Sequence, residues 1–210
     1  MSASFRLSQE VSKSQPDPSS SNSPGQQQQH ASSSTDSTSS ITLVESINDI
    51  FNAPPNTLII HACNTKGSWG GGIAKAFKGK YPAAFEVYKT HCQRNGGELV
   101  GQALLIPPHK EAGEEHFVGC LFTSVSKGRE ADSPAKILSA TGPAMRHLLR
   151  QVQEHNTTHP GEEVSEVRMC KINSGLFKVP WEKTKDVLQA IPTEPDGIRQ
   201  IKVISRSEDD

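Results

Sequence analysis

The 210-residue sequence lacks the features that define several large classes of protein. It contains no apolar run long enough to cross a bilayer, and residues 1–10 include no apolar stretch of signal-peptide length. The formal net charge is −1, so no excess of basic residues predicts binding to nucleic acid or to an anionic membrane. We therefore expect a soluble, intracellular protein of the cytoplasm or nucleus, and a monomer whose partner is a small molecule.

Cysteine is scarce, and its spacing excludes the common zinc and redox motifs. The four cysteines are Cys63, Cys92, Cys120 and Cys170, and no two of them are separated as in C-x-x-C. The pairs His61/Cys63 and His91/Cys92 could begin a metal site, but the further spaced ligands of a closed coordination shell are missing. We expect reduced thiols, no metal and no cofactor.

Hydrophobic residues make up only 33% of the chain, and the mean hydropathy is −0.53. The hydrophobic fraction is low because of residues 12–40, which combine a Gln26–Gln29 run with prolines and a Ser/Thr-rich stretch. Such a segment buries too little apolar surface to offset the entropy of ordering it. We predict a disordered tail over 1–40, one folded domain over 41–206 and a flexible end over 207–210.

Strand-like and helix-like patterns alternate along the predicted domain. Strands are expected at 41–44, 57–62, 99–106, 117–122, 167–172 and 198–204, and helices near 73–77, 82–95, 138–152 and 181–191, with a polar connection over 154–165. Alternation of this kind is typical of an α/β protein in which helices cover both faces of a sheet. The expected fold is a three-layer α/β/α domain with a central mixed, largely parallel sheet.

The segment after the strand at 57–62 has the most unusual composition in the chain. Residues 61–74 read HACNTKGSWGGGIA, and three consecutive glycines open the helix that follows. Glycines allow close approach of a ligand to the backbone, and the N–H groups at a helix N-terminus favour an anion. Because ligands bind at the carboxyl ends of strands in such sheets, this loop is a candidate binding loop. The alternative is a flexible turn over a buried Trp69.

Two other loops have the composition of binding segments. Residues 172–181 leave a strand and enter a helix, with Phe177 available to a sugar or base and Lys178 supplying a cation. The alternative is a packed turn. Residues Asn48 and Asp49 follow the first strand, where the carboxylate could accept a hydrogen bond from an exocyclic amine such as that of adenine. The pair could equally form a turn or a helix cap. Two amide-rich loops facing one crevice would suit a diphosphate.

Together these motifs resemble the macrodomain superfamily, and most closely its fungal ADP-ribose 1″-phosphate phosphatases. The resemblance covers about residues 41–191. It is carried by NDIF at 48–51, HACN at 61–64, GSWGGGIA at 67–74, CLFTS at 120–124, INSGLF at 172–177 and VPW at 179–181.

The resemblance implies a role for each part of the site. Asp49 would hold adenine and Ile50 would line its pocket, Asn64 would contact the distal ribose, 69–74 would wrap that ribose and its phosphate, and 173–179 would cradle the diphosphate. Asn48 stands where the family often has Gly, and Lys178 where a Gly can occur. The predicted substrate-binding residues are Asn48, Asp49, Ile50, Ala62, Cys63, Asn64, Trp69, Gly70, Gly71, Gly72, Ile73, Ala74, Asn173, Ser174, Gly175, Leu176, Phe177, Lys178 and Val179.

The expected reaction is hydrolysis of ADP-ribose 1″-phosphate to ADP-ribose and phosphate. His61, at the end of a strand, is the candidate for proton transfer, and the alternative is a histidine that only packs. Two other functions stay open. The domain could release ADP-ribose from modified protein or from acetylated ADP-ribose, or it could bind ADP-ribose without catalysis.

Overall fold

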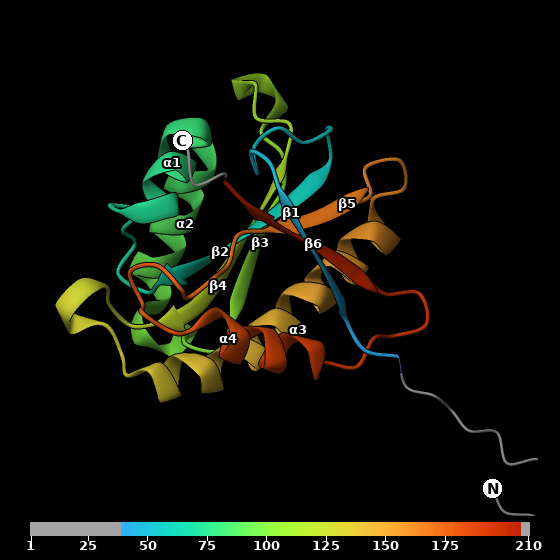
Figure 1. Cartoon of the computed structure of the whole chain (residues 1–210). Helices are drawn as coiled ribbons and strands as arrows, with labels where there is room; N and C mark the ends of the chain where they lie inside the picture. The colour runs from blue at the N-terminus through green and yellow to red at the C-terminus, as the bar shows by residue number, and fades with distance from the viewer. Residues whose placement is uncertain (1–38, 207–210) are drawn as a thin grey trace, which may run out of the picture. The chain divides into compact units, whose positions relative to one another are not determined.

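The computed structural model describes residues 39–206 (Figure 1). The predicted tail over 1–40 lies outside them except for its last two residues, and so does the predicted flexible end over 207–210. The elements are β1 Thr42–Ile47, β2 Thr57–Asn64, α1 Gly72–Lys80, α2 Pro82–Asn95, η1 Gly96–Leu99, β3 Ala103–Ile106, η2 Lys110–Ala112, β4 Phe117–Ser124, η3 Gly128–Glu130, α3 Pro134–Thr158, β5 Glu166–Met169, α4 Trp181–Gln189 and β6 Gln200–Ser205.

The six strands form one sheet in the order β1-β6-β5-β2-β4-β3. Neighbouring strands from β1 to β4 run parallel, and only the β3–β4 pair is antiparallel. The prediction of a mixed, largely parallel sheet is therefore confirmed. Because five adjacent strands point the same way, the loops that follow them meet along one edge of the sheet.

The central strands bury alternate residues on opposite faces of the sheet. On β2, Leu58 and Ile60 pack into the cluster that contains Leu148 of α3, whereas Ile59 packs into the cluster that contains Phe77 of α1. This period of two places a helical layer on each face. Figure 1 shows α1 and α2 on one side and α3 and α4 on the other, which confirms the three-layer fold.

The layer of α3 lies very close to the sheet. A Cβ at Gly119, in the middle of β4, would lie 2.9 Å from Leu148 of α3, so glycine makes room for this contact. The helix begins at Pro134 behind Ser133, whose side chain accepts from the N–H of Lys136 at 3.4 Å. Proline at the first position and a serine cap are typical helix starts.

Within residues 39–206, no helix is both long and apolar enough to span a membrane.

Several predicted boundaries were wrong: the strand expected over 167–172 ends at Met169, the helix expected over 138–152 begins at Pro134, and three others have a clear physical reason. The strand expected over 99–106 is confined to Ala103–Ile106, because Gly101 (φ +84°) turns the chain after η1. The polar connection expected over 154–165 is helical as far as Thr158, since polar residues on a solvated face do not end a helix, and Pro160-Gly161 follow that end. The first strand runs on to Ile47 because it pairs with β6 along its whole length.

Candidate functional site

A cavity of about 410 Å³ lies along the carboxyl ends of the parallel strands. Its walls come from the loops after β1, β2, β4 and β5 and from the end of β6. The lining residues are Asn48, Ile50, Ala62, Asn64, Ser68, Gly70, Gly71, Gly72, Ile73, Ala74, Ala76, Lys127, Cys170, Lys171, Ile172, Asn173, Ser174, Gly175, Leu176, Phe177, Ile204, Ser205 and Arg206. The position agrees with the rule that such sheets bind ligands at their carboxyl edge.

The loop between β2 and α1 is held by hydrogen bonds around Asn64. The Asn64 amide donates to the Ser68 carbonyl at 2.7 Å, and its side-chain oxygen accepts from the N–H of Lys66 at 2.9 Å. The Tyr88 hydroxyl donates to the Asn64 carbonyl at 2.7 Å and accepts from the N–H of Ser68 at 3.2 Å. The loop is therefore fixed from inside, and its glycine side faces the cavity.

The glycines at the start of α1 leave its backbone accessible. Gly71 is the residue before the helix and supplies no side-chain cap, and Gly72 has φ +54°, a conformation that favours glycine. A Cβ at Gly71 would lie 3.0 Å from Leu176 of the facing loop, so the two loops come together across the cavity. The N–H groups of this helix start are the kind of donor that binds anions.

The loop after β5 is anchored by a buried asparagine. Asn173 accepts from the Thr123 hydroxyl at 3.0 Å and donates to the Thr141 hydroxyl at 2.9 Å, which ties the loop to β4 and α3. Asn173 has φ +65° and Lys178 has φ +55°, so both adopt the left-handed conformation. This matches the family pattern in which a glycine can occupy the position of Lys178.

The opposite end of the cavity is formed by residues after β1 and at the end of β6. Asn48 and Ile50 line it together with Ile204. Asp49 is exposed, and its carboxylate accepts a hydrogen bond from the N–H of Phe51 at 2.9 Å. This hydrogen bond is typical of a turn, which was the alternative to a contact with adenine. Asn48 is not among the residues with positive φ, so its backbone conformation does not require a glycine.

The charges around the cavity are of one sign. Lys127, Lys171 and Arg206 line it, and within residues 39–206 no Asp or Glu does. Lys171 also contacts Glu45, with 3.3 Å between Nζ and a carboxylate oxygen. Hydrogen bonds from Lys185 and Trp181 lower the pKa of Glu45 to about 2, so Glu45 is ionised at neutral pH. The cavity is suited to an anionic ligand.

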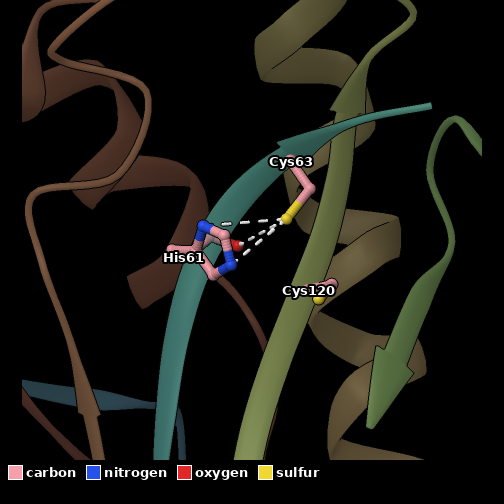
Figure 2. Close-up of side chains that lie close together, drawn as sticks. All are labelled: His61, Cys63 and Cys120. Atoms are coloured by element: carbon pink, nitrogen blue, oxygen red, sulfur yellow. Dashed lines mark hydrogen bonds between the residues drawn. The ribbon is translucent and has the colours of Figure 1, made fainter. Parts of the chain in front are cut away.

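His61 lies in the core of the domain. Its side chain has no exposed surface, stacks on Phe77 with 4.0 Å between ring centroids and meets Trp69 edge-on at 4.8 Å. Figure 2 shows the ring turned toward Cys63, whose Sγ lies 3.4 Å from Nε2. His61 does not line the cavity, and the predicted site residues that it contacts, Cys63 and Trp69, do not line it either.

His61, Cys63 and Cys120 place one nitrogen and two sulfurs within 4.8 Å of one another (Figure 2). All three are buried, and burial raises the pKa of Cys63 well above its ordinary value. A neutral thiol is a poor nucleophile. Three donors are also fewer than a closed zinc site uses. The group has the character of core packing, and none of the four cysteines forms a disulfide.

Most, but not all, predicted binding residues line the cavity. Those that do not are Asp49, Cys63, Trp69, Lys178 and Val179. Trp69 and Val179 are buried beneath their loops, each with 1% of its surface exposed. Residues that sequence reasoning missed are Ser68, Ala76, Lys127, Cys170, Lys171, Ile172, Ile204, Ser205 and Arg206. Most of these follow a strand or end one, so the rule that led to the two loops could also have found them.

The fold and cavity agree with comparisons to known proteins. A family model described as Macro domain matches residues 60–188, and the chain belongs to this family. An ADP-ribose 1″-phosphate phosphatase of Chaetomium globosum is 53% identical over 157 residues, covering 72% of this chain and 84% of that protein. One of the same name from Neosartorya fischeri is 41% identical over 191 residues, covering 77% and 94%.

Solved structures show the same fold at low sequence identity. The macrodomain of Mycobacterium tuberculosis DarG matches with a TM-score of 0.58 and 19% identity, covering 80% of this chain and 99% of that one. The Oceanobacillus iheyensis macrodomain with ADP matches with a TM-score of 0.52 and 18% identity, covering 82% and 87%.

Proposed function

We propose that this protein hydrolyses ADP-ribose 1″-phosphate to ADP-ribose and inorganic phosphate. The observation that carries the proposal is a cavity at the carboxyl edge of a macrodomain sheet, lined by three cations and two amide-rich loops. It is supported by relatives that are 35–53% identical and named ADP-ribose 1″-phosphate phosphatase. The substrate carries a diphosphate and a phosphate monoester, which match the charge of the cavity.

The proposed orientation of the substrate follows the order of the strands. Adenine lies beside Ile50 at the β1 end, where Asp49 can still offer its second carboxylate oxygen to the exocyclic amine. The diphosphate lies against the backbone of 173–177, and the distal ribose lies against Asn64 and Gly70–Gly72. In this orientation the substrate extends along the length of the cavity, and its phosphate monoester lies near the loop after β4.

In the proposed reaction, a water oxygen attacks phosphorus, and the bond between phosphorus and the 1″ oxygen breaks. The ribose oxygen gains a proton and the attacking water loses one, so the products are ADP-ribose and inorganic phosphate. Backbone N–H groups at the start of α1 and the cations of the cavity stabilise the phosphoryl charge. The burial of His61 favours a role in packing over a role in proton transfer. Proton transfer by His61 stays an untested prediction.

A direct assay separates this reaction from the two alternatives. Purified protein is incubated with ADP-ribose 1″-phosphate and, in parallel, with an ADP-ribosylated protein, and released phosphate and ADP-ribose are measured. We expect phosphate from the first substrate and little product from the second. Release of ADP-ribose from the modified protein alone would indicate the hydrolase. Tight binding of ADP-ribose without either product would indicate a non-catalytic binding domain.

A further inference from the structure

A lysine on the loop after β4 reaches across to the glycine loop. Lys127 Nζ donates to the Ser68 hydroxyl at 2.7 Å and occupies the space that a Cβ at Gly70 would need. The lysine therefore lies directly against the backbone that leads into α1. No feature of the sequence alone singled out this residue, because it is brought there by the pairing of β2 with β4.

The loop that carries Lys127 is braced at both ends. The Asp132 carboxylate accepts from the N–H of Val125 at 2.7 Å and from the Ser124 hydroxyl at 3.0 Å. The hydrogen bonds from Val125 and Ser124 lower the pKa of Asp132, so its carboxylate is ionised at neutral pH. Anchoring of the backbone reduces the entropy that the lysine loses when it binds an anion.

The two lysines that line the cavity, Lys171 and Lys127, differ in their partners. Lys171 lies 3.3 Å from the carboxylate of Glu45. Among residues 39–206, no carboxylate oxygen lies within 4.0 Å of Lys127 Nζ, and its one hydrogen-bond partner is the neutral Ser68 hydroxyl. The positive charge of Lys127 is therefore not neutralised by the described part of the domain, and it faces the space available to a ligand.

The strand order places Lys127 at one extreme of the cavity. From the loop after β1 to the loop after β4 the lining crosses five adjacent parallel strands, a span of roughly 19 Å at the usual strand spacing. Ile50 lies at the β1 end and Lys127 at the β4 end. A ligand with its base beside Ile50 and its diphosphate over the β5 loop reaches Lys127 only with the end opposite the base.

We propose that Lys127, aligned by Ser68, binds the terminal phosphate monoester and so selects phosphorylated ADP-ribose over ADP-ribose itself. The inference rests on the proposed function for the identity of the substrate. An ammonium group against a phosphate forms charge-assisted hydrogen bonds, which are stronger than those between neutral groups. Glycine at position 70 is then required because a larger residue would displace the ammonium group.

The test compares Lys127→Met with Arg129→Met, which removes a nearby exposed charge of the same sign. We measure kcat/KM for ADP-ribose 1″-phosphate and, by calorimetry, the Kd of ADP-ribose. Lys127→Met should lower kcat/KM by about 10- to 100-fold and change the Kd of ADP-ribose by less than about threefold. Arg129→Met should leave both unchanged. Equal losses for the two ligands, or no loss, would overturn the inference.

A double-mutant cycle tests the role of Gly70. Its φ is not positive, so Gly70→Ala is compatible with the backbone, and the atom it displaces is the end of a flexible side chain. If Gly70 acts by leaving room for Lys127, Gly70→Ala should lower kcat/KM in the wild-type background and have little further effect in Lys127→Met. Losses that simply multiply would contradict this coupling.

Failure of the proposed function can be distinguished from failure of the inference. If wild-type protein releases no phosphate, the phosphatase proposal fails, and the unhydrolysed compound becomes a ligand whose Kd can be measured. Calorimetry of both ligands with wild type and Lys127→Met then tests the lysine alone. A selective loss for the phosphorylated ligand supports the role of Lys127, and an equal loss contradicts it.

Discussion

The segment from His61 to Gly72 has two halves: the inner half is the end of β2, where the buried His61 and Cys63 alternate with the cavity-lining residues Ala62 and Asn64, and the outer half is a glycine-rich loop. The inner half carries His61 and Cys63, the side chains that are chemically best suited to proton transfer or nucleophilic attack, and both are buried. The outer half ends in glycines that line the cavity with backbone. The residue types that suggest catalysis therefore pack in the core, and glycines without side chains line the cavity.

The difference follows from the geometry of a strand that continues into a loop. On β2, side chains alternate between the two faces of the sheet, and both faces are covered by helices. His61 and Cys63 therefore point into the core whatever their chemistry, while Ala62 and Asn64, which alternate with them, line the cavity. At Asn64, where the strand ends, the chain turns along the edge of the sheet that forms the cavity.

The largest effect is expected from blocking the outer half. Gly72→Val places a β-branched side chain at φ +54° and next to Leu176, so it strains the backbone and fills the cavity. We expect ADP-ribose affinity to fall by about 100-fold or more, equivalent to about 2.7 kcal/mol. Gly79→Val on the same helix, where a Cβ meets no atom within 4 Å, is the control. Equal binding by both variants, measured by calorimetry, would remove Gly72 from the site.

The second effect is expected from the inner half and concerns stability. His61→Ala removes a fully buried ring that stacks on Phe77, and the cavity left behind should cost about 2–4 kcal/mol of the free energy of unfolding. Thermal melting should show a loss of about 5–15 °C. A variant that melts like wild type would show that the ring is not part of the packed core.

A smaller effect is expected at the β1–α4 contact behind the Lys171 side of the cavity. Lys185 and Trp181 donate to Glu45 and lower its pKa from 4.5 to about 2. A lowered pKa stabilises the folded state above pH 4.5, and this contribution is lost as the pH falls from about 4.5 to about 2. Because the side chain is 35% exposed, solvent screening limits the contribution to about 1 kcal/mol or less.

Glu45→Gln tests this contact through the pH dependence of melting. The variant should melt about 1–4 °C below wild type at pH 7, and the difference should shrink as the pH approaches 2. Glu86→Gln, which removes an exposed carboxylate that pairs with Lys89, is the control. A difference that stays constant over this pH range would show that the ionised form of Glu45 is not what stabilises the fold.

The smallest effect is expected from removal of residues 1–38, whose polar composition predicts no buried core. Ser39 should be kept, because its carbonyl accepts from the N–H of Thr193 at 2.8 Å. We expect melting temperature to change by about 1 °C or less and ADP-ribose affinity to stay the same. A loss of several degrees would show that the tail contributes to folding.

The sequence predicted the layers, the largely parallel sheet and two of the loops that line the cavity, because hydrophobic periodicity and glycine runs are local patterns. It did not predict Lys127, which reaches Ser68 from 59 residues away along the chain. The sequence also did not decide whether His61 transfers a proton or packs in the core, because the exposure of a side chain near the end of a strand depends on which helices cover the sheet there. The role of Asp49 could not be decided from the sequence for a similar reason, because an aspartate is suited both to a turn and to a hydrogen bond with a ligand.

The most direct test of this account is the turnover of His61→Leu. Leucine has a volume close to that of histidine, so the core can remain packed, but it cannot transfer a proton. The variant is compared with wild type by phosphate release from ADP-ribose 1″-phosphate per folded molecule, with melting measured on the same samples. We predict turnover within about threefold of wild type. A loss of about 10²–10⁴-fold in a well-folded variant would show that His61 reaches the substrate and would contradict the division between a buried core and a ligand-facing rim.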